Sequence, residues 1–288
     1  MDLSAAPPGL DCLVVSGVER EPYLTCDQRL MIEQAARIVI GLQILQRLLK
    51  PSSILLGIDE RLVEARDRLE RAAAEAGLDW RVAPLQSRYP QADERLLMRA
   101  LFGGSAARKA APNSFVVGAA ALHAVYEAVV LSRPVLERVV TVTGLAVRRP
   151  SNLKVRLGAR LGHLIEECGG FAEPPALLVA GGPMTGSAQL DLEAPVSREL
   201  PGLLALSRAE IRGAAGTSCI GCGRCLEACP WGLAPVQLYK AVEHRRLDRR
   251  ILAELQQCTE CGCCAYVCPA RLPLVAGLHR GRLLAQRN

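Results

Sequence analysis

The chain has 288 residues, half of them hydrophobic, which is enough for two domains or for one domain with an appendage. Aromatic residues make up only 3% of the composition, so an aliphatic core is expected, and the formal net charge is +6. The longest apolar run, 115–131, contains His123 and Glu127 and falls short of the ~20 residues of a membrane span, which excludes a transmembrane helix.

The first part of the chain, 1–136, alternates short apolar runs with helical patterns. Strands are predicted at 11–16, 54–58, 80–83 and 114–117, and helices at 27–50, 61–76, 93–101 and 119–131. Thr25 and Gln28 are spaced as a capping box for the first helix. Such alternation is typical of a doubly wound α/β domain with a mostly parallel sheet, whose ligands lie at the carboxyl ends of the strands.

The pattern changes at 137–208, where strands follow one another closely. Strands are predicted at 139–144, 153–158 and 177–182, with further strands to follow, and a short helix at 161–168 ends before Gly169 and Gly170. This order favours a small α+β module of the β-grasp type.

The last part, 209–288, contains two cysteine runs of identical spacing, C-x2-C-x2-C-x3-C-P. This spacing is that of bacterial ferredoxins, in which three close thiolates hold one cubane and the fourth ligates the other cluster. On that rule one [4Fe–4S] cluster is held by Cys219, Cys222, Cys225 and Cys268, and the second by Cys258, Cys261, Cys264 and Cys229. The runs therefore predict an α-helical, ferredoxin-like dicluster domain.

Structural zinc and disulfides are the two alternatives for these cysteines. Zinc would leave the regular third and fourth ligands unexplained, and disulfides do not suit a chain in which no secretory signal is expected. Cys263 lies off the spacing and is interpreted as a spectator. With Cys12, Cys26 and Cys168 it forms no even framework, which favours a reducing, cytoplasmic setting.

Basic residues are concentrated in the dicluster region, where Arg245, Arg246, Arg249 and Arg250 form a patch. Nucleic-acid binding is one interpretation of such a patch. Two cubanes with eight thiolates carry net negative charge, however, so compensation of the clusters or docking of an acidic redox partner is preferred, and no nucleic acid is expected.

Ordered motifs along almost the whole chain resemble those of the C subunit of the Rnf electron-transport complex. The resemblance extends more distantly to the flavin-bearing subunit of respiratory complex I and to cobalamin reductase. The motifs are VSGVEREPY at 15–23, DQRLM at 27–31, RYPQADE at 88–94, ERVVTVTG at 137–144, GGPMTG at 181–186 and the doubled cysteine run. The resemblance implies an α/β domain for FMN and NADH, a β-grasp module of the soluble-ligand-binding type, and two clusters that pass electrons onward.

The sequence departs from the family pattern at the flavin contacts. The N-terminal barrel-like domain and the Gly-rich loop of family members would precede the first strand, and neither is in the sequence. Other family contacts are replaced by Ser16, Arg20, Ala92 with Asp93, and the turn 118–120. These departures predict that the flavin site is lost or is completed by another chain, so FMN and NADH are doubtful cofactors of this chain by itself.

Four residues of the family's flavin pocket remain: Glu19, Glu21, Tyr89 and Glu94. Under the functional interpretation the first two line the flavin and nicotinamide pocket. The plainer interpretation, which is slightly preferred, is that Glu19 and Glu21 are two solvated carboxylates on a loop.

The leading hypothesis is an electron-transfer subunit of an Rnf-type complex that relays electrons through its two clusters. The donor would be NADH and flavin or ferredoxin, and the acceptor a partner iron–sulfur subunit. The chain is then an electron carrier by itself, and whether it is an enzyme is left open. It is expected to be cytoplasmic and attached peripherally to the inner membrane through the other subunits.

Two alternatives remain for the function. One is a self-contained, NADH-dependent flavin and iron–sulfur reductase of a small cofactor, similar to cobalamin reductase. The other is a degenerate paralogue without flavin, in which the α/β domain is only a scaffold.

Overall fold

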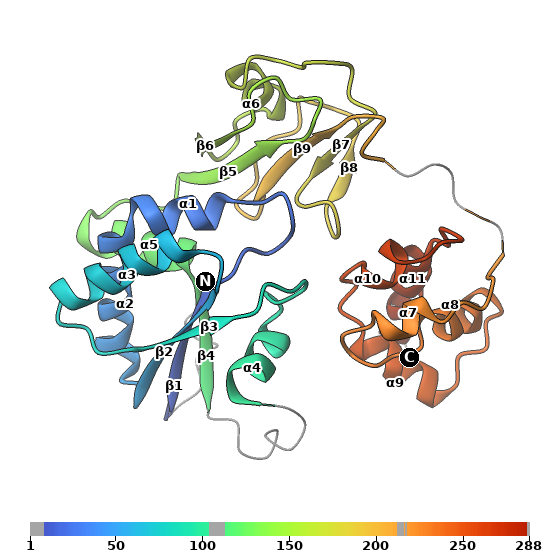
Figure 1. The fold of residues 1–288 in the computed structure, drawn as a ribbon, viewed down its shortest axis with the longest axis horizontal. Coiled ribbons are helices and arrows are strands. Elements are labelled where there is room, and N and C mark those ends of the chain that lie inside the picture. The colour runs from blue at the N-terminus through green and yellow to red at the C-terminus, as the bar shows by residue number, and fades with distance from the viewer. Residues whose placement is uncertain (1–8, 104–112, 212–215, 217, 287–288) are drawn as a thin grey trace. The chain divides into compact units, whose positions relative to one another are not determined.

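The structure is a computed structural model that describes residues 9–103, 113–211, 216 and 218–286 (Figure 1). The chain divides into two compact units. The first extends to Gly182 and includes Ser187–Arg208, and the second comprises Pro183–Gly186 with Ala209–Asn288.

The first unit begins with a parallel sheet of four strands in the order β3-β2-β1-β4. Its strands are β1 (Cys12–Gly17), β2 (Ser53–Asp59), β3 (Arg81–Leu85) and β4 (Ser114–Gly118). The helices between and after them are α1 (Cys26–Glu33), α2 (Ala35–Leu49), α3 (Val63–Glu75), α4 (Glu94–Phe102) and α5 (Ala119–Val130). In β1, Val14 pairs with Leu55 of β2 and with Val116 of β4. The strand order reverses between β1 and β4, which is where ligands bind in this class of sheet.

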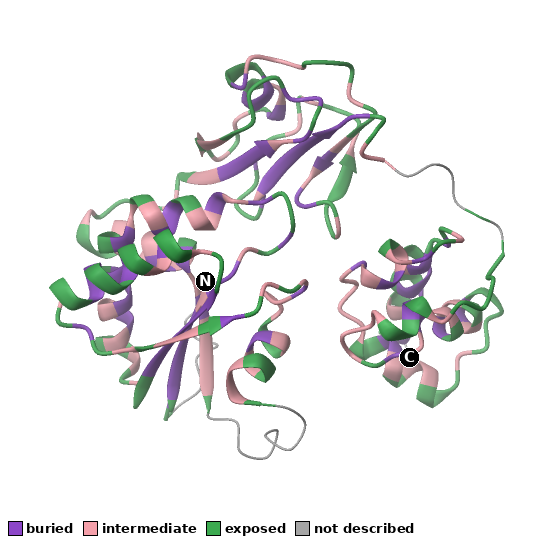
Figure 2. Cartoon of the chain, in the orientation of Figure 1, coloured by how far each residue is buried: buried purple, intermediate pink, exposed green. Residues whose placement is uncertain are grey.

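Helices cover both faces of this sheet. Alternate residues of β1 pack on opposite sides, since Leu13 and Val15 join the core beneath α1, α2, α3 and α5, whereas Val14 joins the core beneath α4. Figure 2 shows β1 and β2 as mostly buried, whereas β3 and β4 are each buried at a single residue. The predicted doubly wound α/β domain is therefore confirmed.

Two local predictions for the first helix are wrong. The helix predicted at 27–50 is interrupted at Gln34, which has φ −125° and separates α1 from α2. Thr25 precedes α1 but forms no capping hydrogen bond. Its hydroxyl instead accepts from Asn152 Nδ2 at 2.9 Å, and its backbone N–H donates to Thr141 Oγ1 at 3.0 Å. The Thr25 hydroxyl and backbone N–H, which a capping box would have used, thus form hydrogen bonds with the next module instead.

The second sheet of the first unit has five strands in the order β6-β5-β9-β7-β8. Its elements are β5 (Glu137–Thr143), β6 (Ser151–Arg156), α6 (Leu161–Glu167), β7 (Leu177–Ala180), β8 (Ser187–Gln189) and β9 (Gly202–Leu206). The parallel pair β5 and β9 is central, and the other pairs are antiparallel. All five residues of β9 are buried (Figure 2). A β-grasp-like module is confirmed, although β8 and β9 were not located by the sequence patterns.

Helices are the only regular secondary structure among the described residues of the second unit. Its helices are α7 (Arg224–Glu227), α8 (Pro235–Glu243), α9 (Arg249–Gln257), α10 (Cys263–Tyr266) and α11 (Leu274–Ala285). Leu238, Leu255 and Leu278 from the three longer helices meet in its core. Across the described part of the chain, no helix combines the length and apolarity needed to cross a membrane.

Candidate metal centre

The two cysteine runs of the second unit fold in the same way. Each has two residues with a left-handed backbone before its short helix, with φ +70° at Gly221 and +76° at Gly223 in the first run, and +56° at Glu260 and +82° at Gly262 in the second. Helices α7 and α10 begin directly after Gly223 and Gly262. The equal spacing of the cysteines is thus accompanied by the same backbone conformation before the short helix of each run.

The predicted second ligand set lines one cavity that is partly open to solvent. Cys258, Cys261 and Cys264 of the second run face Cys229 of the first run there. The rest of the lining is largely apolar and includes Trp231, Pro235, Leu238, Val275 and Leu278. Four sulfur donors in an apolar cavity fit an iron–sulfur cluster, which requires thiolates and a shielded surrounding.

The electrostatics around the buried cysteines indicate that each run lies near the fourth cysteine of the other. Burial raises the pKa of Cys225, and the nearby thiols of Cys268 and Cys219 raise it further. Burial likewise raises the pKa of Cys264 to about 12, with added effects of Cys258, Cys261 and Cys229. Cys268 therefore lies near the first run and Cys229 near the second. The first set is the more open of the two, because Cys219 and Cys222 are exposed.

Cys263, the cysteine that lies off the ferredoxin spacing, is next to the candidate ligand Cys261. It also lines the cavity, and its hydrogen bond to Cys261 lowers the pKa of Cys261 to about 6 and raises that of Cys263 itself. A thiol next to a candidate ligand can donate to its sulfur, which is an outer-shell contact of the kind that orients ligands. Because Cys263 lies off the ferredoxin spacing, only the structure could indicate this contact.

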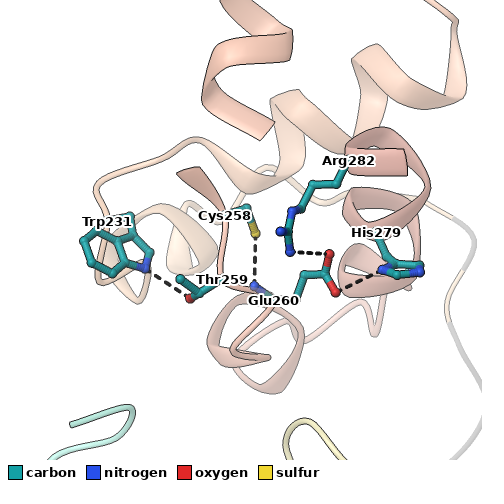
Figure 3. A network of polar contacts seen from close by, with 6 residues as sticks. All are labelled: Trp231, Cys258, Thr259, Glu260, His279 and Arg282. Carbon is teal, nitrogen blue, oxygen red and sulfur yellow. Dashed lines mark hydrogen bonds and ion pairs between the residues drawn. The ribbon is translucent and has the colours of Figure 1, made fainter. Parts of the chain in front are cut away.

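Polar contacts fix the loop that carries Cys258 (Figure 3). The Trp231 indole N–H donates to Thr259 Oγ1 at 3.1 Å, and the Glu260 N–H donates to Cys258 Sγ at 3.4 Å. The Glu260 carboxylate in turn contacts His279 and Arg282 of α11.

Both glutamates of the flavin-pocket motif are withdrawn from solvent, so the interpretation as two solvated carboxylates is wrong. Glu19 follows β1 and accepts the Gln28 N–H at 2.7 Å, and its other oxygen is buried without a hydrogen-bond partner. Glu21 is 8% exposed and lies against Gly182, where an added Cβ would be 2.3 Å from Glu21 Oε2. The loop after β1 therefore packs against Gly182, which follows β7 within the first unit.

A polar cluster surrounds Glu19 that the sequence did not indicate. Ligand atoms of Glu19, Cys26 and Asp27 lie within 4.8 Å of one another. Burial and the Asp27 charge raise the pKa of Glu19 to about 7, and burial also raises the pKa of Asp27. The positive charges of Arg20 and Arg138 lower the pKa of Asp27 and so offset part of the effect of burial. The cluster forms because α1 begins next to the loop after β1.

The other two residues of the flavin-pocket motif, Tyr89 and Glu94, lie between β3 and α4. Tyr89 is half-buried and precedes a cis peptide bond to Pro90, and Glu94 is exposed at the first position of α4. Asp93, which replaces a family glycine, caps α4 by accepting the N–H groups of Arg95 and Leu96 at 3.1 and 3.2 Å. This departure from the flavin motif thus has a local structural role.

Replacing Glu19 by Gln is expected to stabilise the first unit at alkaline pH. Between about pH 4.5 and 7 the unfolded carboxyl loses its proton while the folded one keeps it, so stability falls as pH rises. The loss is complete above pH 7 and reaches about 3 kcal/mol at most. Urea unfolding of variant and parent at pH 4 and pH 8.5 measures this loss of stability. An equal difference in unfolding free energy between the two proteins at both pH values would contradict the prediction.

Comparisons with known proteins agree with this arrangement of domains. Residues 2–132 match the family model of the Nuo51 FMN-binding domain, residues 139–188 that of the SLBB domain, and residues 218–272 that of the 4Fe-4S dicluster domain. In fold, the chain is similar to a chain of an NAD+-reducing [NiFe]-hydrogenase, with a TM-score of 0.64 and 16% identity over 96% of this chain and 60% of that one. The fold and the cysteine site thus define an iron–sulfur protein built on a flavoprotein-type α/β domain.

Sequence relatives make the class more specific. The chain is 37% identical, over 97% of its length, to the C subunit of the ion-translocating oxidoreductase complex of Rhodobacter capsulatus, and covers 55% of it. It is 35% identical, over 81% of its length, to the C subunit of the proton-translocating ferredoxin:NAD(+) oxidoreductase complex of Clostridium ljungdahlii, of which it covers 52%. The chain is therefore a homologue of the C subunits of ion-translocating oxidoreductase complexes, and the resemblance predicted from the motifs is confirmed. It spans about half the length of these relatives.

Proposed function

We propose that the chain is an electron-transfer subunit of an Rnf-type, ion-translocating oxidoreductase complex. The observation that carries this proposal is the cavity in which Cys229 of the first run joins Cys258, Cys261 and Cys264 of the second. When bound, a [4Fe–4S] cluster supplies one-electron redox chemistry at such a site. The protein provides the thiolates, the apolar surrounding and the fixed loops.

The ligands are proposed to be exchanged between the runs. The first cluster is held by Cys219, Cys222, Cys225 and Cys268, and the second by Cys258, Cys261, Cys264 and Cys229. Support comes from the cavity lining and from the pKa of Cys225, which Cys268 and Cys219 raise. Electrons then pass between an NADH and flavin or ferredoxin donor and a partner iron–sulfur subunit. The proposed functional domains are 1–136, 137–208 and 209–288.

The partner that docks on the dicluster domain is proposed to be acidic. Arg245, Arg246, Arg249 and Arg250 are all exposed around the start of α9. A basic surface of this kind steers an acidic partner and orients it on arrival. In the cell, the chain is proposed to lie on the cytoplasmic side of the inner membrane and to be attached there through the other subunits.

A second candidate function is a self-contained NADH-dependent flavin and iron–sulfur reductase. The match of residues 2–132 to an FMN-binding domain favours it, together with the buried Glu19 and Glu21 beside the carboxyl end of β1. Tyr89 and Glu94 would complete the remnants of that pocket.

An iron, sulfide and flavin assay on anaerobically purified chain tests both functions. The electron-transfer proposal expects about eight irons and eight sulfides per chain, and much fewer would contradict it. The reductase expects, in addition, a flavin absorbance band that is released on denaturation. Iron without flavin rejects the self-contained reductase and leaves the electron-transfer subunit.

A further inference from the structure

The second cysteine run places a glutamate where the first run has a glycine. Gly221 and Glu260 each come two residues after the first cysteine of their run, and each has a left-handed backbone. Each donates its N–H to that cysteine, at 3.4 Å in both runs. Glycine adopts this conformation freely, whereas a residue with a Cβ pays roughly 1 kcal/mol. The left-handed backbone of Glu260 is therefore unfavourable by itself and requires contacts that stabilise it.

Contacts of the Glu260 side chain with α11 stabilise this conformation (Figure 3). Arg282 Nη1 donates to one carboxylate oxygen at 2.8 Å, and His279 Nδ1 lies 3.0 Å from the other. Both partners lie on the same side of α11, one turn apart. On the other side of the loop, Trp231 donates to Thr259. Gly221 has no side chain through which the first run could be anchored in this way.

We propose that Glu260 is a positioning residue for the second cluster, through which α11 sets the reduction potential of that cluster alone. His279 and Arg282 hold the Glu260 backbone so that its N–H points at Cys258 Sγ. A hydrogen bond to a ligand sulfur favours the reduced, more negative cluster and so raises its potential. This inference rests on the proposed role of Cys258 as a ligand.

Two substitutions separate the backbone effect from the effect of charge. Glu260→Gly and Glu260→Ala remove the same carboxylate, but only glycine keeps the left-handed backbone without an anchor, as Gly221 does. In the full chain, redox titrations followed by electron paramagnetic resonance are expected to show a lower second-cluster potential for Glu260→Ala than for Glu260→Gly. The first cluster should not shift in either variant. Cys222→Ser and Cys261→Ser assign the two signals.

A double variant leaves residue 260 unchanged and removes its anchors. In His279→Leu with Arg282→Met the N–H is released and the carboxylate loses its cation, and both changes lower the second-cluster potential. If Glu260→Ala does not fold, an unchanged or raised second-cluster potential in this variant still contradicts the inference.

Equal second-cluster potentials in the alanine and glycine variants would overturn the inference, as would an unchanged or raised potential in the double variant. These outcomes leave the proposed function intact as long as the unmodified chain holds about eight irons. Much less iron in the unmodified chain overturns the proposed function instead.

Discussion

Replacing Cys229 with Ser is expected to remove the second cluster and to lower the iron content from about eight irons per chain to about four. The reason is the proposed exchange of ligands between the runs. Although Cys229 belongs to the first run, it lines the cavity that contains Cys258, Cys261 and Cys264. Iron and sulfide assays on the reconstituted chain measure the loss, and electron paramagnetic resonance shows which cluster is lost.

Cys263→Ser is the matched control for this prediction. It changes a cysteine that lines the same cavity and contacts Cys261, but that lies off the ferredoxin spacing. It is expected to keep about eight irons, with at most a shift in the potential of the second cluster. If Cys229→Ser instead removed only the signal of the cluster at Cys219–Cys225, ligation would be confined within each run and the exchanged assignment would be wrong.

Features that depend on short stretches of sequence were predictable. The cysteine runs determine both the metal and the local backbone, because their spacing is a property of a loop of a few residues. The parallel sheet was also predictable, since β1 and β2 are short apolar runs with helical patterns after them. In both cases the information lies within one element and its neighbours.

Features that depend on contacts between distant segments were not predictable. Thr25 loses its capping role because Asn152 and Thr141, more than a hundred residues away, take its hydrogen bonds. Glu21 is buried because the turn at Gly182 packs against it. Neither contact can be inferred from the local sequence, which is why a loop position predicts solvated carboxylates for the two glutamates of the flavin motif.

The contacts of the loop after β1 with Gly182 and Gly202 give this loop a structural role that does not require flavin. A Cβ at residue 182 would collide with Glu21, and a Cβ at Gly202 would lie 2.4 Å from Leu24 of the same loop. The residues that resemble a cofactor pocket thus also join the α/β domain to the β-grasp module. A remnant of the flavin motif can therefore persist in the sequence whether or not flavin binds.

Replacing Gly41 with Ala is expected to destabilise the first unit by about 2 kcal/mol. Gly41 lies inside α2, where alanine would ordinarily gain about 1 kcal/mol of helix propensity. Here its Cβ would lie 2.0 Å from the carbonyl oxygen of Leu122 in α5. Because the obstacle is backbone, the two helices must separate, and overpacking of this kind costs more than the propensity gain.

Gly118→Ala is the control for this last prediction. Gly118 is the N-cap of α5, has φ −88°, and leaves nothing within 4 Å of an added Cβ, so the change is expected to cost only the loss of a glycine cap, at most about 1 kcal/mol. Urea unfolding of both variants, followed by circular dichroism, gives the comparison. Equal midpoints for Gly41→Ala and the parent would show that α2 and α5 can separate at no cost, contrary to the close packing of the buried Leu42 and Leu122 on either side of this contact.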